Sequence, residues 1–213
     1  MEVISLPKAS FESEVQRATD ILAHAGVIVF PTDTLYGLGA DAFDDEAVDR
    51  VYRIKGRDEK KPIHCIVADM EMAARYAEVS DDARLLAKAF FPGPLTLILK
   101  KREEWSHGIG RNLDTIGMRI PRNDFCTALA RSFGRPFTAT SANRSGEAPH
   151  RTIEAIEVQL RDVANEISLA FDAGTLAASK PSTVVDLSGE EPVILREGAI
   201  EVADIWNTIR AEP

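Results

Sequence analysis

The chain has 213 residues, 45% of them hydrophobic, and its 34 acidic and 25 basic side chains leave a formal net charge of −9. This length and composition predict one enzyme-sized domain over 1–213, with its core over about 8–200. The excess of acids argues against a surface that binds nucleic acid non-specifically, because such binding depends on Lys and Arg neutralising phosphates.

Apolar residues at helical spacing predict a first helix, capped by Ser10 and ended by Gly26. The apolar run 27–30 predicts a buried strand directly after it. A second helix is expected from about Asp44, followed by a strand near 63–68. Helix and strand alternate, which indicates an α/β fold.

This alternation continues to the end of the chain. Further helices are predicted near 70–77, 81–91, 124–133, 152–160 and 202–210, and further strands near 95–100, 115–120, 137–140, 167–171, 183–186 and 193–196. No internal repeat, low-complexity stretch or linker divides the predicted domain.

Two polar segments lie at predicted strand or helix ends, where open α/β sheets usually place their sites. Residues 31–39 offer hydroxyls, a carboxylate and two glycines that let a ligand approach the backbone, and a turn with local caps is the alternative. Lys55, Arg57, Lys60 and Lys61 follow the second helix. They indicate an anion pocket, and the alternative is that they are solvated cations at the negative helix end.

Two later segments carry polar groups on or after predicted strands. Thr115 and Arg119 share one strand face, and the apolar flanks of Arg119 predict a partly buried guanidinium that needs an anionic partner. An internal salt bridge is the alternative. Residues 138–146 can offer backbone N–H groups to a phosphate, or they form a Ser/Thr-rich turn. The Pro-rich turn 91–96 is expected to be structural, with no chemistry.

Several common motifs are absent from the sequence. Without a phosphate-binding Gly-rich loop or a dinucleotide fingerprint, a nucleotide would be held by scattered cations and hydroxyls. The lack of a Gly-x-Ser-x-Gly elbow and of a metal-binding His pair disfavours covalent and zinc mechanisms. Cys65 and Cys126 lie far apart, and no apolar run reaches the roughly 18 residues of a membrane span. We therefore expect a soluble, cytoplasmic protein without a disulfide framework.

Eight segments occur in order between Pro31 and Gly198: PTDTLYGLGAD, KGR, KKP, FFPGPLT, DTIGMRIP, TSANRSG, PSTVVD and LREG. Together they resemble the motif series of the YrdC/Sua5/TsaC family. The resemblance implies a twisted mixed sheet with flanking helices around a large basic concave cavity. It also implies L-threonylcarbamoyladenylate synthase activity. L-threonine, bicarbonate and ATP, with Mg²⁺ carried by the ATP phosphates, would give threonylcarbamoyl-AMP and pyrophosphate for the threonylcarbamoyladenosine modification of tRNA.

The resemblance further implies roles for individual residues. Threonine is expected to contact Thr34, His64, Arg119, Ala139 and Ser182. ATP is expected to contact Arg57, Lys61, Thr115, Ser141, Asn143, Pro149 and Arg196. Lys55 and Arg57 are expected to act in catalysis through their positive charge, and no metal ligands are expected from the protein. Because the planar fork of Arg119 matches a carboxylate, Arg119→Lys is expected to raise the threonine requirement.

Three positions depart from the family pattern. Ile66 stands where many members have a histidine, and His64 lies two residues earlier, on the same face of the expected strand. Asp58 and Glu197 replace common prolines.

Two other functions are possible for this fold. One is an RNA-binding or ribosome-associated module in contact with tRNA, which the net acidity disfavours. The other is carbamoyl transfer of the kind found in hydrogenase-maturation proteins, whose additional segments this sequence lacks. The sequence resembles the short form of the family, which passes threonylcarbamoyl to tRNA through downstream transferase proteins.

Overall fold

The computed structural model describes residues 1–6 and 11–210, and seven α-helices occur within these ranges. They are α1 (Glu12–Ala23), α2 (Asp45–Lys55), α3 (Met70–Tyr76), α4 (Asp81–Phe90), α5 (Asp124–Phe133), α6 (Ile153–Gln159) and α7 (Val202–Arg210). Two 3₁₀ turns, η1 (Gly108–Gly110) and η2 (Arg161–Glu166), lie in connections. The helices predicted at 124–133 and 202–210 have the expected bounds.

Strands and helices alternate along most of the chain, as expected for an α/β protein. The strands are β1 (Glu2–Ser5), β2 (Ile28–Pro31), β3 (Tyr36–Gly39), β4 (His64–Ile66), β5 (Leu95–Lys100), β6 (Thr115–Arg119), β7 (Phe137–Ser141), β8 (Leu169–Asp172), β9 (Thr183–Asp186) and β10 (Val193–Arg196). The described strands form one sheet in the order β1-β8-β2-β3-β7-β4-β6-β5-β9-β10. The expected mixed sheet is confirmed, because β4 runs parallel to β6 and antiparallel to β7.

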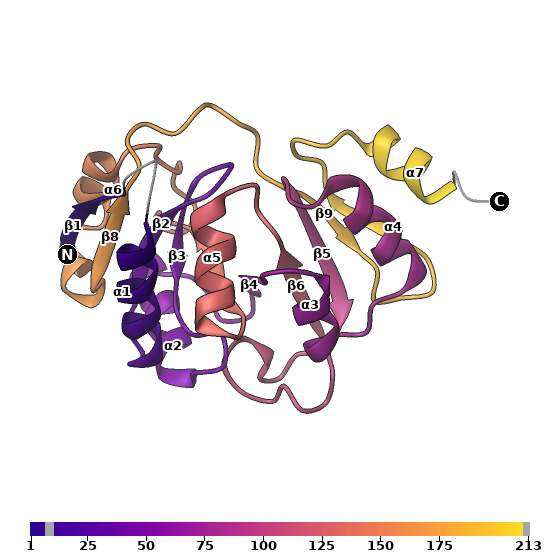
Figure 1. Cartoon of the computed structure of the whole chain (residues 1–213), viewed down its shortest axis with the longest axis horizontal. Coiled ribbons are helices and arrows are strands. Elements are labelled where there is room, and N and C mark those ends of the chain that lie inside the picture. The colour runs from indigo at the N-terminus through magenta and orange to yellow at the C-terminus, as the bar shows by residue number, and fades with distance from the viewer. Residues whose placement is uncertain (7–10, 211–213) are drawn as a thin grey trace.

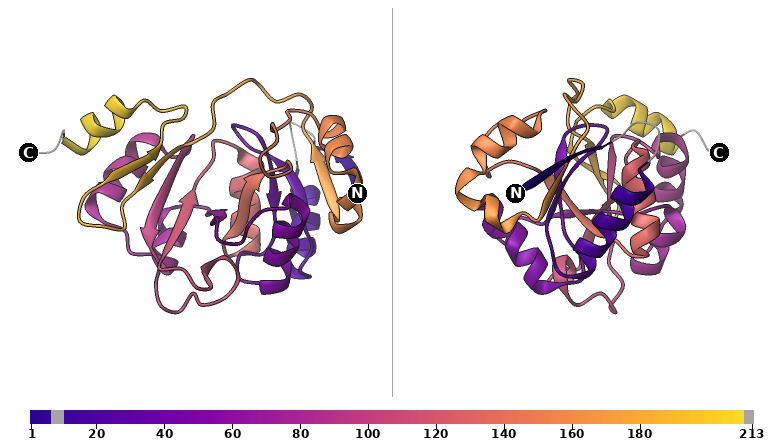
Figure 2. Two further views of the ribbon diagram at one scale, coloured as in Figure 1. Left: turned by 180° about the vertical axis from the view of Figure 1, so that it is seen from behind. Right: turned by 60° about the vertical axis from the view of Figure 1, so that its left-hand side comes forward.

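The sheet is strongly twisted and its two faces are covered unequally (Figures 1 and 2). Helices α1, α4 and α5 lie in front of the sheet in Figure 1. Helix α2 lies on the opposite side, toward the end that carries β1 (Figure 2). Near β4, β5 and β6 no helix lies over this second face in the rear view.

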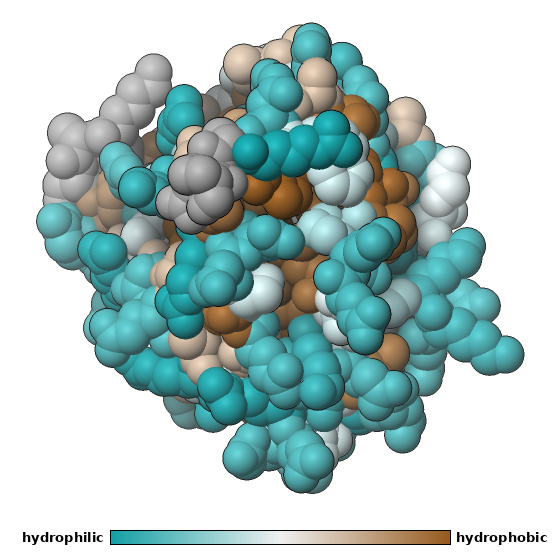
Figure 3. All heavy atoms as spheres, turned by 90° about the vertical axis from the view of Figure 1, so that its right-hand side faces the viewer, coloured by the Kyte–Doolittle hydropathy of each residue, from teal (hydrophilic) through white to brown (hydrophobic). Residues whose placement is uncertain are grey.

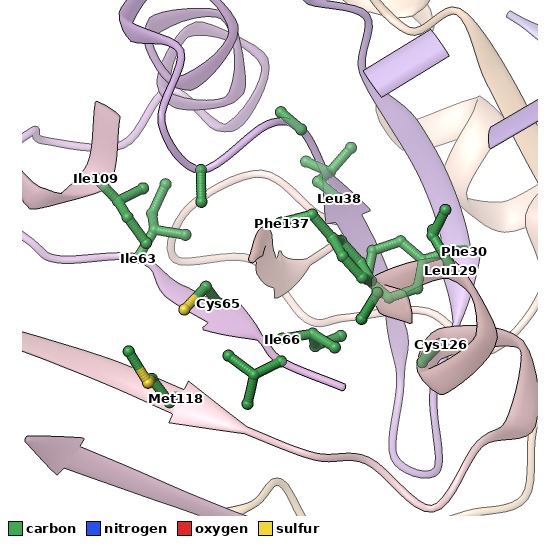
Figure 4. Close-up of a cluster of buried hydrophobic side chains, with 14 of the residues drawn as sticks. Phe30, Leu38, Ile63, Cys65, Ile66, Ile109, Met118, Cys126, Leu129 and Phe137 are labelled. Carbon is green, nitrogen blue, oxygen red and sulfur yellow. The ribbon is translucent and has the colours of Figure 1, made fainter. Parts of the chain in front are cut away.

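The core is continuous across the central strands and the helices packed on them. Figure 4 shows the cluster around Phe30, Cys65, Leu129 and Phe137, in which the rings of Phe30 and Phe137 meet edge to face at 5.3 Å. The run 28–30 of β2 is fully buried, which explains its unbroken apolar sequence. Cys65 and Cys126 are both buried and free.

Two strands were not predicted. β1 was missed because three of its four residues are exposed, and its stability comes from parallel pairing with β8. The segment of β3, expected as a loop, is a buried strand. Its glycines are needed because the Phe30 ring lies against them: a Cβ on Gly37 or Gly39 would lie 2.8 Å or 2.9 Å from ring atoms of Phe30.

The first helix ends earlier than expected. The predicted cap, Ser10, lies outside the described residues. The helix ends at Ala23, and Gly26 closes the turn beyond it by donating its N–H to the carbonyl oxygen of Ile21.

At the far end of the sheet, β10 is an edge strand that exposes Val193 (52%) and Leu195 (56%). Apolar atoms surrounded by polar side chains are visible on the side of the molecule that carries the C-terminus (Figure 3). No helix within the described ranges is both long and apolar enough to cross a membrane.

Candidate functional site

A cavity of about 220 Å³ is lined by residues from several central strands of the sheet. Its lining comes from the ends of central strands and from the connections next to them, as expected for an α/β sheet. Of the residues singled out in the sequence, it brings together Thr34, Arg57, His64, Arg119, Ala139, Ser141, Ser182 and Arg196. Stretches of chain far apart in sequence therefore converge on one hollow.

The remaining predicted residues do not line the cavity. Lys55 and Asn143 are buried beneath it, whereas Lys61 and Pro149 are exposed on loops outside it. Thr115 is half-buried at the start of β6, four residues from Arg119 on the same strand face. None of these five residues belongs to the lining of the cavity.

The lining also includes residues to which the sequence interpretation gave no individual role, although most of them lie in the segments that it named. They are Thr32, Leu35, Tyr36, Gly37, Pro62, Ile63, Thr96, Thr140 and Pro181. Thr96 belongs to the turn segment 91–96, which was expected to be structural, and the structure places it in the cavity wall. The available signal was a single hydroxyl inside the otherwise apolar start of β5.

Arg119 is buried at the end of β6 and has an internal anionic partner, so the salt-bridge alternative holds. Its Nη2 lies 2.6 Å from Asp33 Oδ1, and both side chains are about nine-tenths buried. Asp33 Oδ2 also accepts the backbone N–H of Arg122 at 3.1 Å. Burial lowers the pKa of Arg119, while the Asp33 carboxylate opposes that shift. The Nε atom of Arg119 is buried with no partner among the described residues.

The turn before β3 is shaped by Thr32. Its Oγ1 accepts the backbone N–H groups of Thr34 and Leu35 and donates to the Leu35 carbonyl oxygen at 2.7 Å. Thr34 thereby faces the cavity with its Oγ1 3.4 Å from Arg119 Nη1.

Lys55 occupies a different position from that of a cation facing phosphates. Its ammonium donates to the carbonyl oxygens of Ser141 (2.6 Å) and Asn143 (3.0 Å) and to Asn143 Oδ1 (3.0 Å). Burial, together with the nearby Arg57, lowers the pKa of Lys55 to about 7, whereas its three acceptors favour the charged form. Lys55 therefore ties the end of α2 to the end of β7 and sets the position of Ser141.

Arg57 follows Gly56, whose left-handed backbone (φ 57°) ends α2. The Arg57 guanidinium donates to the carbonyl oxygens of Lys61 (3.0 Å) and Pro62 (3.2 Å) and lines the cavity. Lys61 thus contributes its backbone to holding Arg57, while its own side chain is exposed.

Arg196 holds Ser182 through backbone and side chain together. Its Nε and Nη2 donate to the Ser182 carbonyl oxygen at 3.1 Å and 2.9 Å, and Nη2 also donates to Ser182 Oγ at 3.1 Å. Gly198 is required just beyond β10, because a Cβ there would lie 2.2 Å from the Pro181 carbonyl oxygen.

His64 lies among three cavity-lining cations. Burial, followed by the charges of Arg196, Arg119 and Arg57, lowers its pKa to about 4, so the imidazole is neutral near pH 7. The ring packs on Gly117, where a Cβ would lie 2.7 Å from His64 Cδ2. Ile66, on the same strand face, is completely buried and does not line the cavity.

These contacts define the chemistry that the cavity can support. Three guanidinium groups and several hydroxyls can donate hydrogen bonds to an anionic ligand, and the described lining contains no carboxylate. The described residues also contain no group of three or more His, Cys, Asp or Glu side chains that could hold a metal ion. The described lining therefore offers donors for an anionic ligand and none of the carboxylate ligands that Mg²⁺ prefers.

Comparison with known proteins agrees with this geometry. The Sua5_yciO_yrdC family, described as "Telomere recombination", matches residues 20–198. A "Threonylcarbamoyl-AMP synthase" from Pyrococcus abyssi is 34% identical over 208 residues, which is 97% of this chain and 60% of that protein. This chain thus spans less than two thirds of that relative.

Two solved structures are similar to the whole fold. The crystal structure of P. abyssi Sua5 complexed with L-threonine has a TM-score of 0.91 at 33% identity, over 99% of this chain and 61% of that one. The crystal structure of E. coli YciO has a TM-score of 0.80 at 31% identity, over 94% of this chain and 96% of that one. The chain is therefore a member of the Sua5/YciO/YrdC family.

Proposed function

We propose that this protein is an L-threonylcarbamoyladenylate synthase, which forms threonylcarbamoyl-AMP and pyrophosphate from L-threonine, bicarbonate and ATP. The observation that carries the proposal is the convergence of Arg57, Arg119 and Arg196 on one cavity in a protein of net charge −9. A local cluster of cations in an acidic protein favours a small polyanion over an extended nucleic-acid surface. The name of the P. abyssi relative and the L-threonine in the Sua5 structure support the same substrates.

The proposed reaction needs positioning and charge neutralisation more than covalent catalysis. The threonine amine and bicarbonate give a carbamate and water. A carbamate oxygen then forms a bond to the α-phosphorus of ATP, the bond from that phosphorus to the bridging oxygen breaks, and pyrophosphate leaves. No side chain has to act as a nucleophile. Because the adenylyl group passes from pyrophosphate to the carbamate, an enzyme with this activity is a nucleotidyltransferase.

The cavity residues divide naturally between the two ligands. Arg119 is the clamp for the threonine carboxylate, since a guanidinium can donate two parallel hydrogen bonds to that group. Arg57, Arg196 and Ser141, which also line the cavity, are assigned to the phosphates, and Lys55 would act by fixing the main chain of Ser141. Mg²⁺ would enter as the complex with ATP, bound by the phosphates. The product passes to further proteins that transfer threonylcarbamoyl to tRNA.

A pyrophosphate-release assay tests this proposal directly. The wild-type protein is expected to release pyrophosphate from ATP only when threonine and bicarbonate are both supplied. Arg119→Lys is expected to raise the KM for threonine far more than the KM for ATP, because the ammonium loses the bidentate geometry. Release without threonine, or none under any condition, would overturn the proposal, and an RNA-binding module would give none.

A further inference from the structure

Three side chains from neighbouring strands meet in one wall of the cavity. Thr96 Oγ1 on β5 lies 2.9 Å from Ser182 Oγ, immediately before β9, and Arg196 Nη2 on β10 lies 3.1 Å from the same Ser182 oxygen. Thr96 is fully buried, and Ser182 is its only side-chain hydrogen-bond partner among the described residues. The sequence interpretation gave no role to Thr96.

The number of hydrogen bonds that the Ser182 hydroxyl can donate and accept decides whether it can donate one to a ligand. A hydroxyl has one hydrogen and two lone pairs, whereas a guanidinium can only donate. Arg196 therefore occupies one lone pair of Ser182 Oγ. If Thr96 donates to the second lone pair, the Ser182 hydrogen is left free to point into the cavity.

The opposite direction of the hydrogen bond between Ser182 and Thr96 would prevent Ser182 from donating to a ligand. If Ser182 donated to Thr96, it would have no hydrogen left for a ligand. An anionic ligand selects the first arrangement, because a carboxylate only accepts hydrogen bonds. The clamp of Arg196 on the Ser182 carbonyl oxygen, at 3.1 Å and 2.9 Å, keeps the main chain fixed while the hydroxyl turns.

We propose that Thr96 is a positioning residue that holds Ser182 as a hydrogen-bond donor toward the carboxylate of threonine. The inference rests on the proposed function and adds a determinant of amino-acid affinity to it. Thr96 acts on the substrate through Ser182 and takes no part in the chemical step.

The test compares Thr96→Val with Thr96→Ser in steady-state kinetics and in calorimetric titration with threonine alone. Val has nearly the shape of Thr but lacks the hydroxyl, so the KM and Kd for threonine are expected to rise about three- to tenfold, with the KM for ATP unchanged. Ser retains the hydroxyl and is expected to keep values close to those of the wild type.

Thr138→Val is the matched control. Thr138 is also a fully buried strand threonine, but its hydroxyl bonds the backbone of Leu38 and Ala40 and does not line the cavity. This variant is expected to lower stability without changing threonine affinity. If it raises the Kd for threonine as much as Thr96→Val does, the effect is structural and the inference is wrong.

Two further results would overturn the inference while leaving the proposed function intact. One is wild-type threonine affinity in an active Thr96→Val variant, and the other is a rise confined to the KM for ATP. Failure of the proposed function is separately visible, because the wild-type protein would then release no pyrophosphate. The calorimetric titration still measures the threonine site in that case.

Discussion

The Arg119–Asp33 pair allows a quantitative test of how the site is built. The perturbation is Arg119→Met, which keeps much of the apolar stem and removes the guanidinium. Asp33 Oδ1 then loses its 2.6 Å contact while only 11% of the carboxyl side chain is exposed, so an almost buried charge is left with the Arg122 N–H as its donor. Breaking such a pair costs about 3–5 kcal/mol of the free energy of unfolding.

A double-mutant cycle separates the pair from the packing around it. Adding Asp33→Asn removes the stranded charge, so the double variant is expected to be about 2 kcal/mol more stable than the sum of the single effects predicts. Urea unfolding of the four proteins measures this, with Arg131→Met on the exposed face of α5 as the control, expected within about 0.5 kcal/mol of wild type. Additive single effects would refute the reasoning.

Three other predictions concern His64, Gly117 and Lys55, which lie in or next to the cavity wall. His64 has a pKa of about 4 in the folded protein against an ordinary value of 6.5, so the unfolded chain binds the proton first as the pH falls. The free energy of unfolding of the wild type, compared with that of His64→Asn, is therefore expected to be highest above pH 6.5 and to fall by about 3 kcal/mol as the pH falls toward 4. Equal pH profiles of the two proteins in urea unfolding would contradict this. Gly117→Ala forces the His64 ring to move and is expected to cost about 1–3 kcal/mol of unfolding free energy; an unchanged urea midpoint would rule out the close contact. Lys55→Met leaves three oxygen acceptors without their shared donor and is expected to lower the free energy of unfolding by about 2–4 kcal/mol. Lys61→Met, at an exposed position, is the control and is expected to change that free energy little. Similar urea midpoints for the two variants would argue against the Lys55 contacts.

Much of the fold could be predicted from apolar periodicity. β5, β9 and β10 have the expected bounds because each alternates or runs apolar between clear turn signals. β3 could not be recognised, since its glycines are selected by the Phe30 ring on the neighbouring strand and not by any strand propensity. A residue type that is required by a contact with a neighbouring strand produces no periodic pattern in the sequence.

The site was predictable in outline for a different reason. The motif residues at strand ends, such as Arg119 and Ser141, converge because the sheet brings those ends together. The direction of a side chain is harder to predict. A lysine at a helix end usually faces solvent, yet Lys55 turns inward onto main-chain oxygens. Thr96 was missed because one hydroxyl in an apolar strand shows no pattern until its partner Ser182 is placed beside it.

The most direct test of the central claim is mass spectrometry of the product formed from carbon-13-labelled bicarbonate, threonine and ATP. The account predicts threonylcarbamoyl-AMP that carries the label, with the yield reduced in Arg119→Lys and restored by raising the threonine concentration. Detection of AMP or ADP without the labelled adduct, in the presence of all three substrates, would contradict it.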